Sequence, residues 1–393
     1  MEEKKYQIIL YGATGFTGKL CAEYFHSNYP DLNWAIAGRN KEKLENLKTE
    51  LNLDCDIFVA DSEDYEAIQN FVKQTKVVLS AAGPFARYST KVVEACVECK
   101  THYTDITGEN HWVKGLIDRF HDKAALDGTR IIPSCGYDSI PSDLGVYFSV
   151  TRSNQPVTHV TVYHSAKGGA SGGTTETMFT MGPLPKEMRD PFLLNPQDSV
   201  SETQKRKSLD NFSVKPIPGT DAFSGMGLMA FANTRVVRRS SALFDLNQKS
   251  YGPDFTFKEL GSYPSKAAAR ITSLVLMSAF LVIATPLRYL VRPLLPKPGD
   301  GPDKEARDNG WFRGLFIAEL EDGSEKRFEI YGSGDPGYKS TSKMVCEAAL
   351  TLAFSDDLPF GNEFGGVLTS AVGLGDPLIS RLMNAGITFE ALS

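Results

Sequence analysis

The stretch that decides the fold is YQIILY, residues 6–11, followed directly by GATGFTG, residues 12–18. The first six residues form an apolar run too short for a helix, and a helical stretch, KLCAEYFHSN, follows the glycines. This order predicts a strand, a glycine turn and a helix. Such glycines let the backbone approach a pyrophosphate, and the helix N-terminus presents unpaired N–H groups to an anion. We therefore predict dinucleotide binding at residues 12–18, with a purely structural turn as the alternative.

The next apolar run, residues 33–38, begins about twenty residues after the glycines, as a βαβ unit requires, and ends at Arg39-Asn40. Sites for NAD usually have a carboxylate here, which accepts a hydrogen bond from the ribose 2′-hydroxyl, whereas an arginine suits a 2′-phosphate. The sequence therefore favours NADP(H) over NAD(H). The alternative is that Arg39 is a solvated residue before the charged helix predicted at residues 41–51.

Strands and helices continue to alternate up to about residue 150. We predict strands at residues 56–61, 77–82, 102–106 and 130–135, separated by helices at 64–74, 89–99 and 109–126. Strands that are apolar throughout indicate a doubly wound parallel sheet covered on both faces, and ligands bind at the carboxyl ends of such strands. There Asp61 could contact the adenine amino group, and the turn at 82–84 would meet the nicotinamide half. The predicted cofactor-binding residues are Gly12, Ala13, Thr14, Gly15, Phe16, Thr17, Gly18, Arg39, Asn40, Asp61, Ala82, Gly83 and Pro84.

Residues 136–143, GYDSIPSD, are expected to form a polar loop at the catalytic edge of this sheet. Hydride transfer leaves an anion that needs a proton, so a proton donor must lie near the nicotinamide. By position, the candidate catalytic residues are Tyr137 and Asp138 on this loop and Asp105 after an earlier strand. Each of them could instead be structural or contact the substrate.

A second domain is expected from about Pro156, because residues 157–164 alternate with the period of two of a half-buried antiparallel strand. Gly172, Gly173 and Thr174 then open a helical stretch, and their amides could hold a carboxylate or phosphate of the substrate; a flexible turn is equally compatible. Tyr163 and Lys167 have the spacing of a short-chain reductase pair, but four residues of a strand span roughly 13 Å, which is too far for that chemistry.

Residues 183–265 are polar and are expected to contain insertions and loops. Three arginines, Arg235, Arg238 and Arg239, could face anionic headgroups or an acidic substrate, and a solvated basic face is the favoured interpretation.

Residues 271–287, ITSLVLMSAFLVIATPL, carry no charge and are bracketed by Arg270 and Arg288. A full membrane span needs about 20 apolar residues, with roughly 17 as the lower limit. Pro286 interrupts the stretch, and the flanking arginines with Tyr289 suit an interfacial position. We favour a peripheral or monotopic membrane contact over a buried core helix, an oligomer-interface helix or a true span.

The C-terminal part is predicted to complete both domains. Residues 311–317 and 326–331 indicate a β-hairpin around Glu321-Asp322-Gly323, and residues 340–354 a helix whose apolar stripe packs on the nucleotide-binding domain. The expected domains are residues 1–150 for NADP binding, 151–338 for substrate binding or oligomerisation, including the apolar segment 271–295, and 339–393 for helices that return to the first domain.

Composition and charge exclude several classes of protein. The 393 residues are 41% hydrophobic and 23% charged, and a net charge of −6 argues against a broad nucleic-acid footprint. Six cysteines in so long a chain, with a polar start, indicate reduced thiols in the cytosol. Cys96 and Cys99 lack the second pair that a zinc knuckle needs, so no metal site is predicted.

Five motifs in order, GATGFTG, AGRN, AAGPF, YTDITGE and CGYDSIPSD, together with the late GDPGY, make the chain resemble the saccharopine dehydrogenase-like oxidoreductases. The resemblance extends over nearly the whole chain. It implies a Rossmann domain, a second α+β domain and C-terminal helices that return to the first. The same family includes proteins similar to trans-acting enoyl reductases, which act on complex lipids. The long apolar segment departs from saccharopine reductases, whose substrate is small and water-soluble.

The resulting hypothesis is an NADP(H)-dependent reductase of a C=O, C=N or activated C=C bond in a lipid-like molecule. We expect it at the cytosolic face of a membrane, on a lipid droplet, the endoplasmic reticulum or the outer mitochondrial surface, and otherwise in the cytoplasm. A homodimer is compatible with the sequence. The alternatives are a soluble amino-acid reductase and a non-catalytic, NADPH-binding membrane protein.

Overall fold

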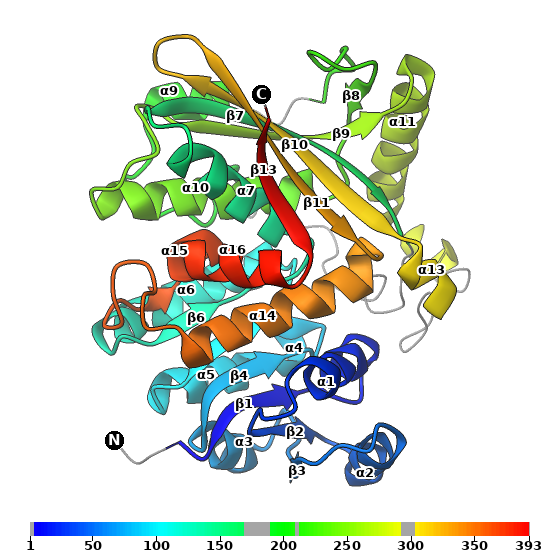
Figure 1. The fold of residues 1–393 in the computed structure, drawn as a ribbon, viewed down its shortest axis with the longest axis vertical. Helices are drawn as coiled ribbons and strands as arrows, with labels where there is room; N and C mark the ends of the chain where they lie inside the picture. Colours follow the sequence, from blue (N-terminus) through cyan, green and yellow to red (C-terminus); the bar gives the residue numbers. More distant parts are fainter. Residues whose placement is uncertain (1–3, 169–188, 209–211, 292–302, 393) are drawn as a thin grey trace.

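Two β-sheets lie one above the other, with helices between and around them (Figure 1). The computed structural model describes residues 4–168, 189–208, 212–291 and 303–392. The lower sheet has seven parallel strands in the order β12-β6-β5-β4-β1-β2-β3. Its strands are β1 (Tyr6–Tyr11), β2 (Trp34–Gly38), β3 (Asp56–Val59), β4 (Thr75–Ser80), β5 (His102–Asp105), β6 (Arg130–Ile132) and β12 (Gly366–Val367). The predicted doubly wound α/β fold with a second domain is confirmed.

Helices cover both faces of the parallel sheet, because alternate residues of its central strands point to opposite sides. Ile8 and Leu10 of β1 belong to one core cluster with residues of α1 and α14, whereas Ile9 and Tyr11 belong to another with α3, α5 and α6. The covering helices are α1 (Phe16–Asn28), α2 (Lys41–Glu50), α3 (Tyr65–Val72), the short α4 (Phe85–Tyr88), α5 (Thr90–Glu98), α6 (Asn110–Leu126) and α14 (Thr341–Phe354).

Strand β3 differs from the expectation for residues 56–61. It ends at Val59, and both Asp56 and Val59 are exposed. The reason is its place at the edge of the sheet, where only β2 pairs with it. Asp61 therefore lies in the turn that follows the strand.

The upper sheet is mixed, with the order β13-β11-β10-β7-β9-β8. The hairpin of β10 and β11 is antiparallel, as predicted, and β7 pairs antiparallel with β10 and parallel with β9. Its strands are β7 (Val157–Lys167), β8 (Phe223–Gly225), β9 (Thr256–Tyr263), β10 (Trp311–Leu320), β11 (Glu325–Ser333) and β13 (Ile387–Leu392). Tyr163 and Lys167 lie together in β7, in strand geometry.

Helix α7 (Ile140–Thr151) packs between the two sheets. The prediction of a polar loop over residues 136–143 is therefore wrong for its second half. Pro141 stands in the first helical turn, where its missing N–H costs nothing, and Ser142 and Asp143 are buried there. Gly145 lets the ring of Phe316 in β10 approach, since a Cβ at Gly145 would come 2.2 Å from that ring.

Helix α10 (Ala230–Leu246) corrects the expectation for residues 183–265, because this buried helix and strand β9 both fall in that range. Its three arginines are not on a solvated face: Arg235, Arg238 and Arg239 are at most 5% exposed. Arg238 donates to the carbonyl oxygens of Pro191 and Ser208, and Arg239 to those of Leu194 and Val367. These guanidinium groups tie loops together, and periodicity alone does not reveal that use.

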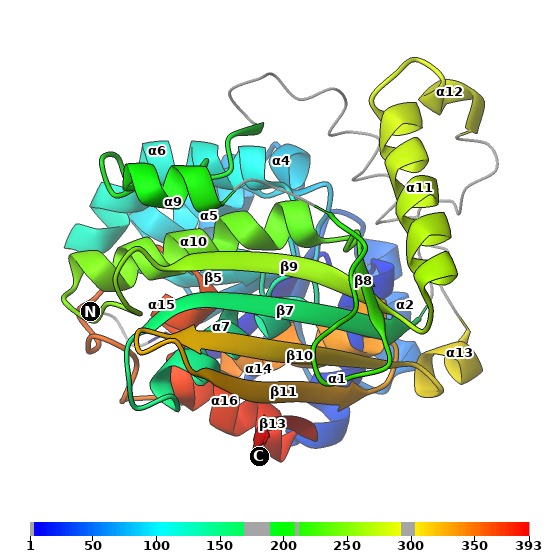
Figure 2. The same ribbon diagram turned by 90° about the horizontal axis from the view of Figure 1, so that it is seen from above.

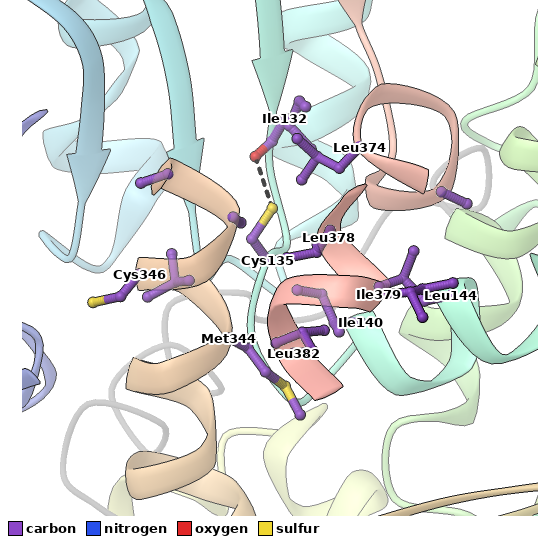
Figure 3. Close-up of a cluster of buried hydrophobic side chains, with 14 of the residues drawn as sticks. Ile132, Cys135, Ile140, Leu144, Met344, Cys346, Leu374, Leu378, Ile379 and Leu382 are labelled. Atoms are coloured by element: carbon purple, nitrogen blue, oxygen red, sulfur yellow. Dashed lines mark hydrogen bonds between the residues drawn. The ribbon is translucent and has the colours of Figure 1, made fainter. Parts of the chain in front are cut away.

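The C-terminal residues join both sheets. A short π-helical turn (Pro336–Ser340) leads into α14, which contacts α1, β1, β4 and β5. Helices α15 (Ser370–Gly373) and α16 (Gly375–Asn384) follow. Figure 3 shows the apolar cluster where α7, α14 and α16 meet β6, with Ile132, Leu144, Met344 and Leu378 among its members. The expected apolar stripe of α14 is buried throughout.

Helix α11 (Lys266–Ile283) stands at the periphery, followed by α12 (Arg288–Val291) (Figure 2). Only Ala269 and Ser273 of α11 are buried, so within this chain it is not a core helix. Within the described residues it is also the one helix that could cross a membrane by length and composition. Two further short helices are α9 (Glu202–Lys207) and α13 (Lys304–Asp308).

Replacement of Arg239 by Met should destabilise the fold. The side chain is 1% exposed, so its loss leaves the carbonyl groups of Leu194 and Val367 without their donor. We expect the free energy of unfolding to fall by about 2–4 kcal/mol in urea titrations. Arg119→Met, at an exposed position on α6, should change it by less than ~0.5 kcal/mol. Equal effects of the two substitutions would contradict the structural role of Arg239.

Candidate functional site

The glycine turn after β1 depends on a backbone conformation that only glycine adopts easily. Gly12 has φ +81°, and a Cβ there would come 2.8 Å from the amide nitrogen of Ala82, at the end of β4. A Cβ on Gly18 would come 2.2 Å from the carbonyl oxygen of Gly12. The two glycines therefore bring β1, α1 and the end of β4 into close contact.

Helix α1 begins at this turn with an open N-terminus. Its N-cap is Gly15, which has no side chain to accept from the first-turn amides. Helix geometry leaves these amides without intrahelical acceptors, and together they favour an anion. Thr14 and Gly15 are exposed, and Phe16 and Thr17 are partly exposed. Ala13, in contrast, is fully buried and serves the turn through its backbone. The turn thus fits a diphosphate.

Arg39 lies just beyond β2, where the 2′-phosphate of NADP would need a cation. Its guanidinium carbon is 5.8 Å from the ring centre of Tyr88, and that of Arg87 lies 5.1 Å from the same ring. Tyr11 lies near both Arg39 and Asp61. Burial and the Asp61 carboxylate raise the pKa of its phenol to about 12, while Arg39 opposes the rise. The structure therefore brings Arg39 and Asp61 to one end of the sheet.

Asn40, predicted beside Arg39 at the phosphate, has a local structural role. Its side-chain oxygen accepts from the Lys43 amide at 2.9 Å and caps α2. Asp61 is exposed and accepts from the Glu63 amide, also at 2.9 Å. Both side chains retain polar atoms that could contact a ligand.

The turn at Ala82, Gly83 and Pro84 meets Gly12 through Ala82. A residue that the sequence did not single out holds it in place. Glu109, 1% exposed, accepts from the amides of Phe85 at 2.8 Å and Ala86 at 3.1 Å, at the start of α4. Glu109 stands just before α6 in sequence, so only the tertiary structure reveals this contact.

Asp105 is enclosed by protein atoms. Its side chain is 0% exposed and accepts from the Tyr103 hydroxyl and from the amides of Thr107 and Ser134, each at 2.9 Å. Burial raises the pKa of this carboxyl group to about 7. These contacts hold the loops after β5 and β6 and favour the structural alternative for Asp105 over the role of proton donor.

Tyr137 and Asp138 are partly exposed at the same edge of the sheet. The ring of Tyr137 packs 5.1 Å from that of Phe312, and its amide donates to the Thr341 hydroxyl. Burial, and then the carboxyl groups of Glu259 and Asp138, raise the pKa of its phenol. Burial also raises the pKa of Asp138 to about 6. Both residues remain candidates for proton transfer.

A polar cluster, formed by Ser139, Ser142, His164, Asn233 and Glu259, lies behind them between the two sheets. Ser142 Oγ is 2.7 Å from Glu259 Oε2 and 2.9 Å from His164 Nε2, and Asn233 bridges Ser139 and Glu259. Its members come from α7 and its N-cap, β7, α10 and β9, which are far apart in sequence. Only Ser139 and Ser142 fall in a motif that the sequence analysis singled out, GYDSIPSD. Ser142 is fully buried, so this is not the exposed nucleophile of a hydrolase.

The predicted substrate loop and the cysteine pair remain to be placed. Gly172, Gly173 and Thr174, predicted to bind substrate, lie outside the described residues. Cys96 is buried and Cys99 partly buried. Among the residues that the structure describes, no group of three or more His, Cys, Asp or Glu side chains is placed to hold a metal ion.

Comparison with known proteins agrees with this geometry. Residues 8–132 match the family model of the saccharopine dehydrogenase NADP binding domain. A protein of Mycobacterium tuberculosis, provisionally named a trans-acting enoyl reductase, is 34% identical over 98% of this chain and 97% of its own length. A trans-acting enoyl reductase of Mycobacterium ulcerans is 31% identical over 99% of this chain and 98% of its own.

Two solved structures share the whole fold. Saccharopine dehydrogenase (L-Glu forming) of Saccharomyces cerevisiae aligns with a TM-score of 0.55 and 14% identity, over 99% of this chain and 100% of that one. Homospermidine synthase of Legionella pneumophila, in complex with NAD, gives 0.56 and 8%, over 99% and 92%. At these identities the likeness concerns the fold alone.

Replacement of Arg39 by Ala should lower the affinity for NADPH by about 10- to 100-fold, because a charge-assisted pair with the 2′-phosphate is lost. The affinity for NADH, which lacks that phosphate, should stay within about 3-fold. Fluorescence titration of both cofactors checks this, with Arg119→Ala as a remote control. An equal loss for both cofactors, or no loss for either, would remove the role given to Arg39.

Proposed function

This chain belongs to the saccharopine dehydrogenase-like oxidoreductases, a family that it shares with the trans-acting enoyl reductases, and we propose that it reduces a lipid-like substrate at a membrane surface. The chain is an NADP-dependent oxidoreductase with a small-molecule substrate. The lipid nature of that substrate and the membrane are the proposal. The bond reduced is a C=C, C=O or C=N, and the names of the relatives favour the C=C of an enoyl group.

Bound NADPH supplies a hydride, and this chain's residues bind it and provide the proton. The first-turn amides of α1 would hold the diphosphate, and Arg39 would hold the 2′-phosphate. The turn at Ala82–Pro84 would border the nicotinamide half. Tyr137 and Asp138 stand at the same edge, where the anion left by hydride transfer must be protonated.

The observation that carries the lipid proposal is the apolar surface of α11. Five of its residues, Ile271, Leu274, Val275, Met277 and Leu281, are between 59% and 67% exposed. From Ile271 to Leu281 the helix rises by about 15 Å. Single exposed apolar residues are ordinary, but a contiguous strip of this length indicates a surface that is covered in use. Arg270 in the first part of α11 and Arg288 at the start of α12 flank this surface in sequence, and such cations suit the headgroup region of a membrane.

Apolar residues also connect α11 with the candidate site. The ring of Phe280 in α11 is 5.9 Å from that of Phe231, at the start of α10. Two residues earlier, the methyl group of Met229 approaches Gly108, and so does the Asp138 carboxylate, at 3.8 and 4.0 Å from the Cβ that Gly108 would carry. Apolar side chains thus lie between α11 and the loop that carries Asp138.

The proposal includes a location. We expect the protein at the cytosolic face of a membrane, such as that of a lipid droplet, the endoplasmic reticulum or the outer mitochondrial surface. A second copy of the chain could cover α11 instead, and in that case the protein would be a dimer that leaves membranes untouched.

The substrate class can be tested with the purified full chain and NADPH. We expect faster oxidation of NADPH with a ten-carbon trans-2-enoyl thioester in phosphatidylcholine vesicles than with its four-carbon analogue, because only the longer chain reaches along the apolar contacts. Loss of reduced-nicotinamide absorbance and the gain of two hydrogens in the product are the measurements. Oxidation of NADPH only with water-soluble amino-acid imines would favour the soluble reductase. If no substrate that is offered supports oxidation of NADPH, a non-catalytic protein would be favoured.

Membrane binding can be tested by flotation with vesicles that contain anionic lipid. The intact chain should float, and the double variant Leu274→Glu with Leu281→Glu should lose most of its flotation, since each charge opposes burial in the interface. Both positions are exposed, so the fold should persist. Leu246→Glu, an equally exposed leucine at the end of α10, is the matched control. Unchanged flotation of the double variant would contradict the membrane role of α11, and loss of dimerisation instead would identify a subunit interface.

A further inference from the structure

The polar cluster between the two sheets has a buried carboxyl group at its centre, and no positive charge of the cluster pairs with it. Glu259 in β9 is 3% exposed. Within 4 Å of its oxygens, the one basic group in the described part of the chain is His164, with Nε2 at 3.8 Å. Burial lowers the pKa of His164 to about 4, so this imidazole is neutral at pH 7 and does not compensate a carboxylate.

We infer that Glu259 is the buried acid that resupplies the proton consumed in the reduction, and that its protonation is coupled to the redox state of the bound nicotinamide. This inference rests on the reductase chemistry described above, but not on the lipid nature of the substrate.

The hydrogen bonds of the cluster accommodate Glu259 in both protonation states. When it is ionised, the Ser142 hydroxyl donates to Oε2 at 2.7 Å and the Asn233 amide donates to Oε1 at 3.0 Å. When it is protonated, it can donate to Ser142 Oγ, whose own proton then turns to His164 Nε2 at 2.9 Å. Neither state leaves a carboxyl oxygen unsatisfied, and no heavy atom has to move. Burial raises the pKa of Glu259 to about 7, so both states are populated near neutrality.

Charged groups face Glu259 from two directions. On the side of the candidate site are Asp138 and Tyr137, and the carboxyl group of Asp138 adds to the raised pKa of Glu259. On another side Glu259 is among the residues that line a cavity of about 250 Å³. The basic residues of that cavity are Arg206, Lys207, Arg238 and Lys258. Glu259 thus stands between a cavity and the loop that carries the candidate proton donors.

The proton balance of the reduction gives this placement a purpose. One substrate carbon gains a hydride from the reduced cofactor, and the resulting anion takes a proton from Tyr137 or Asp138. Glu259 would then return a proton to that donor and become a carboxylate, and a proton from solvent would restore it. With the cofactor bound, this carboxylate would form in the step that leaves the nicotinamide ring positively charged, and the two opposite charges would favour each other.

Equilibrium binding tests this inference without any substrate. The dissociation constants of NADP+ and NADPH are measured with the full chain from about pH 5.5 to 8.5. Because only NADP+ has the charged ring, its affinity relative to NADPH should rise with pH as Glu259 ionises, by about 10-fold for each pKa unit by which the ring lowers the pKa of Glu259. The 2′-phosphate titrates in both cofactors, so it cancels from this ratio.

Glu259→Gln should make the ratio independent of pH while NADPH still binds. Ser142→Ala removes a donor to the carboxylate and should move the midpoint of the change to higher pH, which a merely structural role would not do. Glu319→Gln, a carboxyl group of the same sheet that projects from the face opposite α7, is the matched control and should behave as the parent protein. Circular dichroism checks that each variant is folded.

A ratio that does not change with pH in the parent protein, or the same change in Glu259→Gln, would overturn the inference. If the chain shows the predicted pH dependence but none of the offered substrates supports oxidation of NADPH, the proposed function is contradicted. The inference about the protonation of Glu259 would then still stand. Absence of binding by both cofactors would overturn the diphosphate site and this inference together.

Discussion

Everything at the nucleotide end of the molecule depends on how closely three backbone segments meet at Gly12. Its positive φ turns the chain off β1, and the absence of a Cβ lets the turn touch Ala82 at the end of β4. Gly18 lets the first turn of α1 press on the carbonyl group of Gly12. The open amides of α1, the turn at Ala82–Pro84 and Arg39 beyond β2 are arranged around this contact. A side chain at Gly12 would separate the parts that must grip one diphosphate.

The two sheets are joined by buried polar groups as well as by apolar packing. Asp143 in α7 accepts from the Ser370 hydroxyl and the Ala371 amide, while Arg130 in β6 donates to the carbonyl oxygens of Gly373 and Pro359. Each buried charge is satisfied by several neutral partners instead of one opposite charge, which is how a polar group is retained at low cost inside a protein. Such contacts require correct placement of distant segments, so they make the relative position of the sheets specific.

Much of the parallel sheet could be predicted because its signals are local. An apolar run such as YQIILY, a glycine turn and an amphipathic helix occupy adjacent residues, and the ends of the predicted strands lie within about three residues of the expected positions. The diphosphate site and Arg39 follow from the same local order. Glu109, Glu259 and the arginines of α10 could not be predicted, because their partners lie tens to more than a hundred residues away. From sequence alone, a charged residue is expected to be exposed to solvent, and only the tertiary contacts show that Arg239 is buried. The apolar run at 271–287 had the opposite ambiguity, since the same composition fits a core helix and an exposed one.

The placement of α14 has a consequence for the biogenesis of this protein. Helix α14 covers one face of the parallel sheet through its contacts with α1, β1 and β4, yet about 190 residues separate it from the end of α7. At synthesis rates of roughly 5–20 residues per second, the ribosome needs about 10–40 s to make them. Throughout that interval the face of the sheet that α14 covers stays exposed, and its apolar side chains favour aggregation of the nascent chain. The order of the elements along the chain therefore requires either a chaperone that covers this face during translation or a nascent chain that stays soluble without α14.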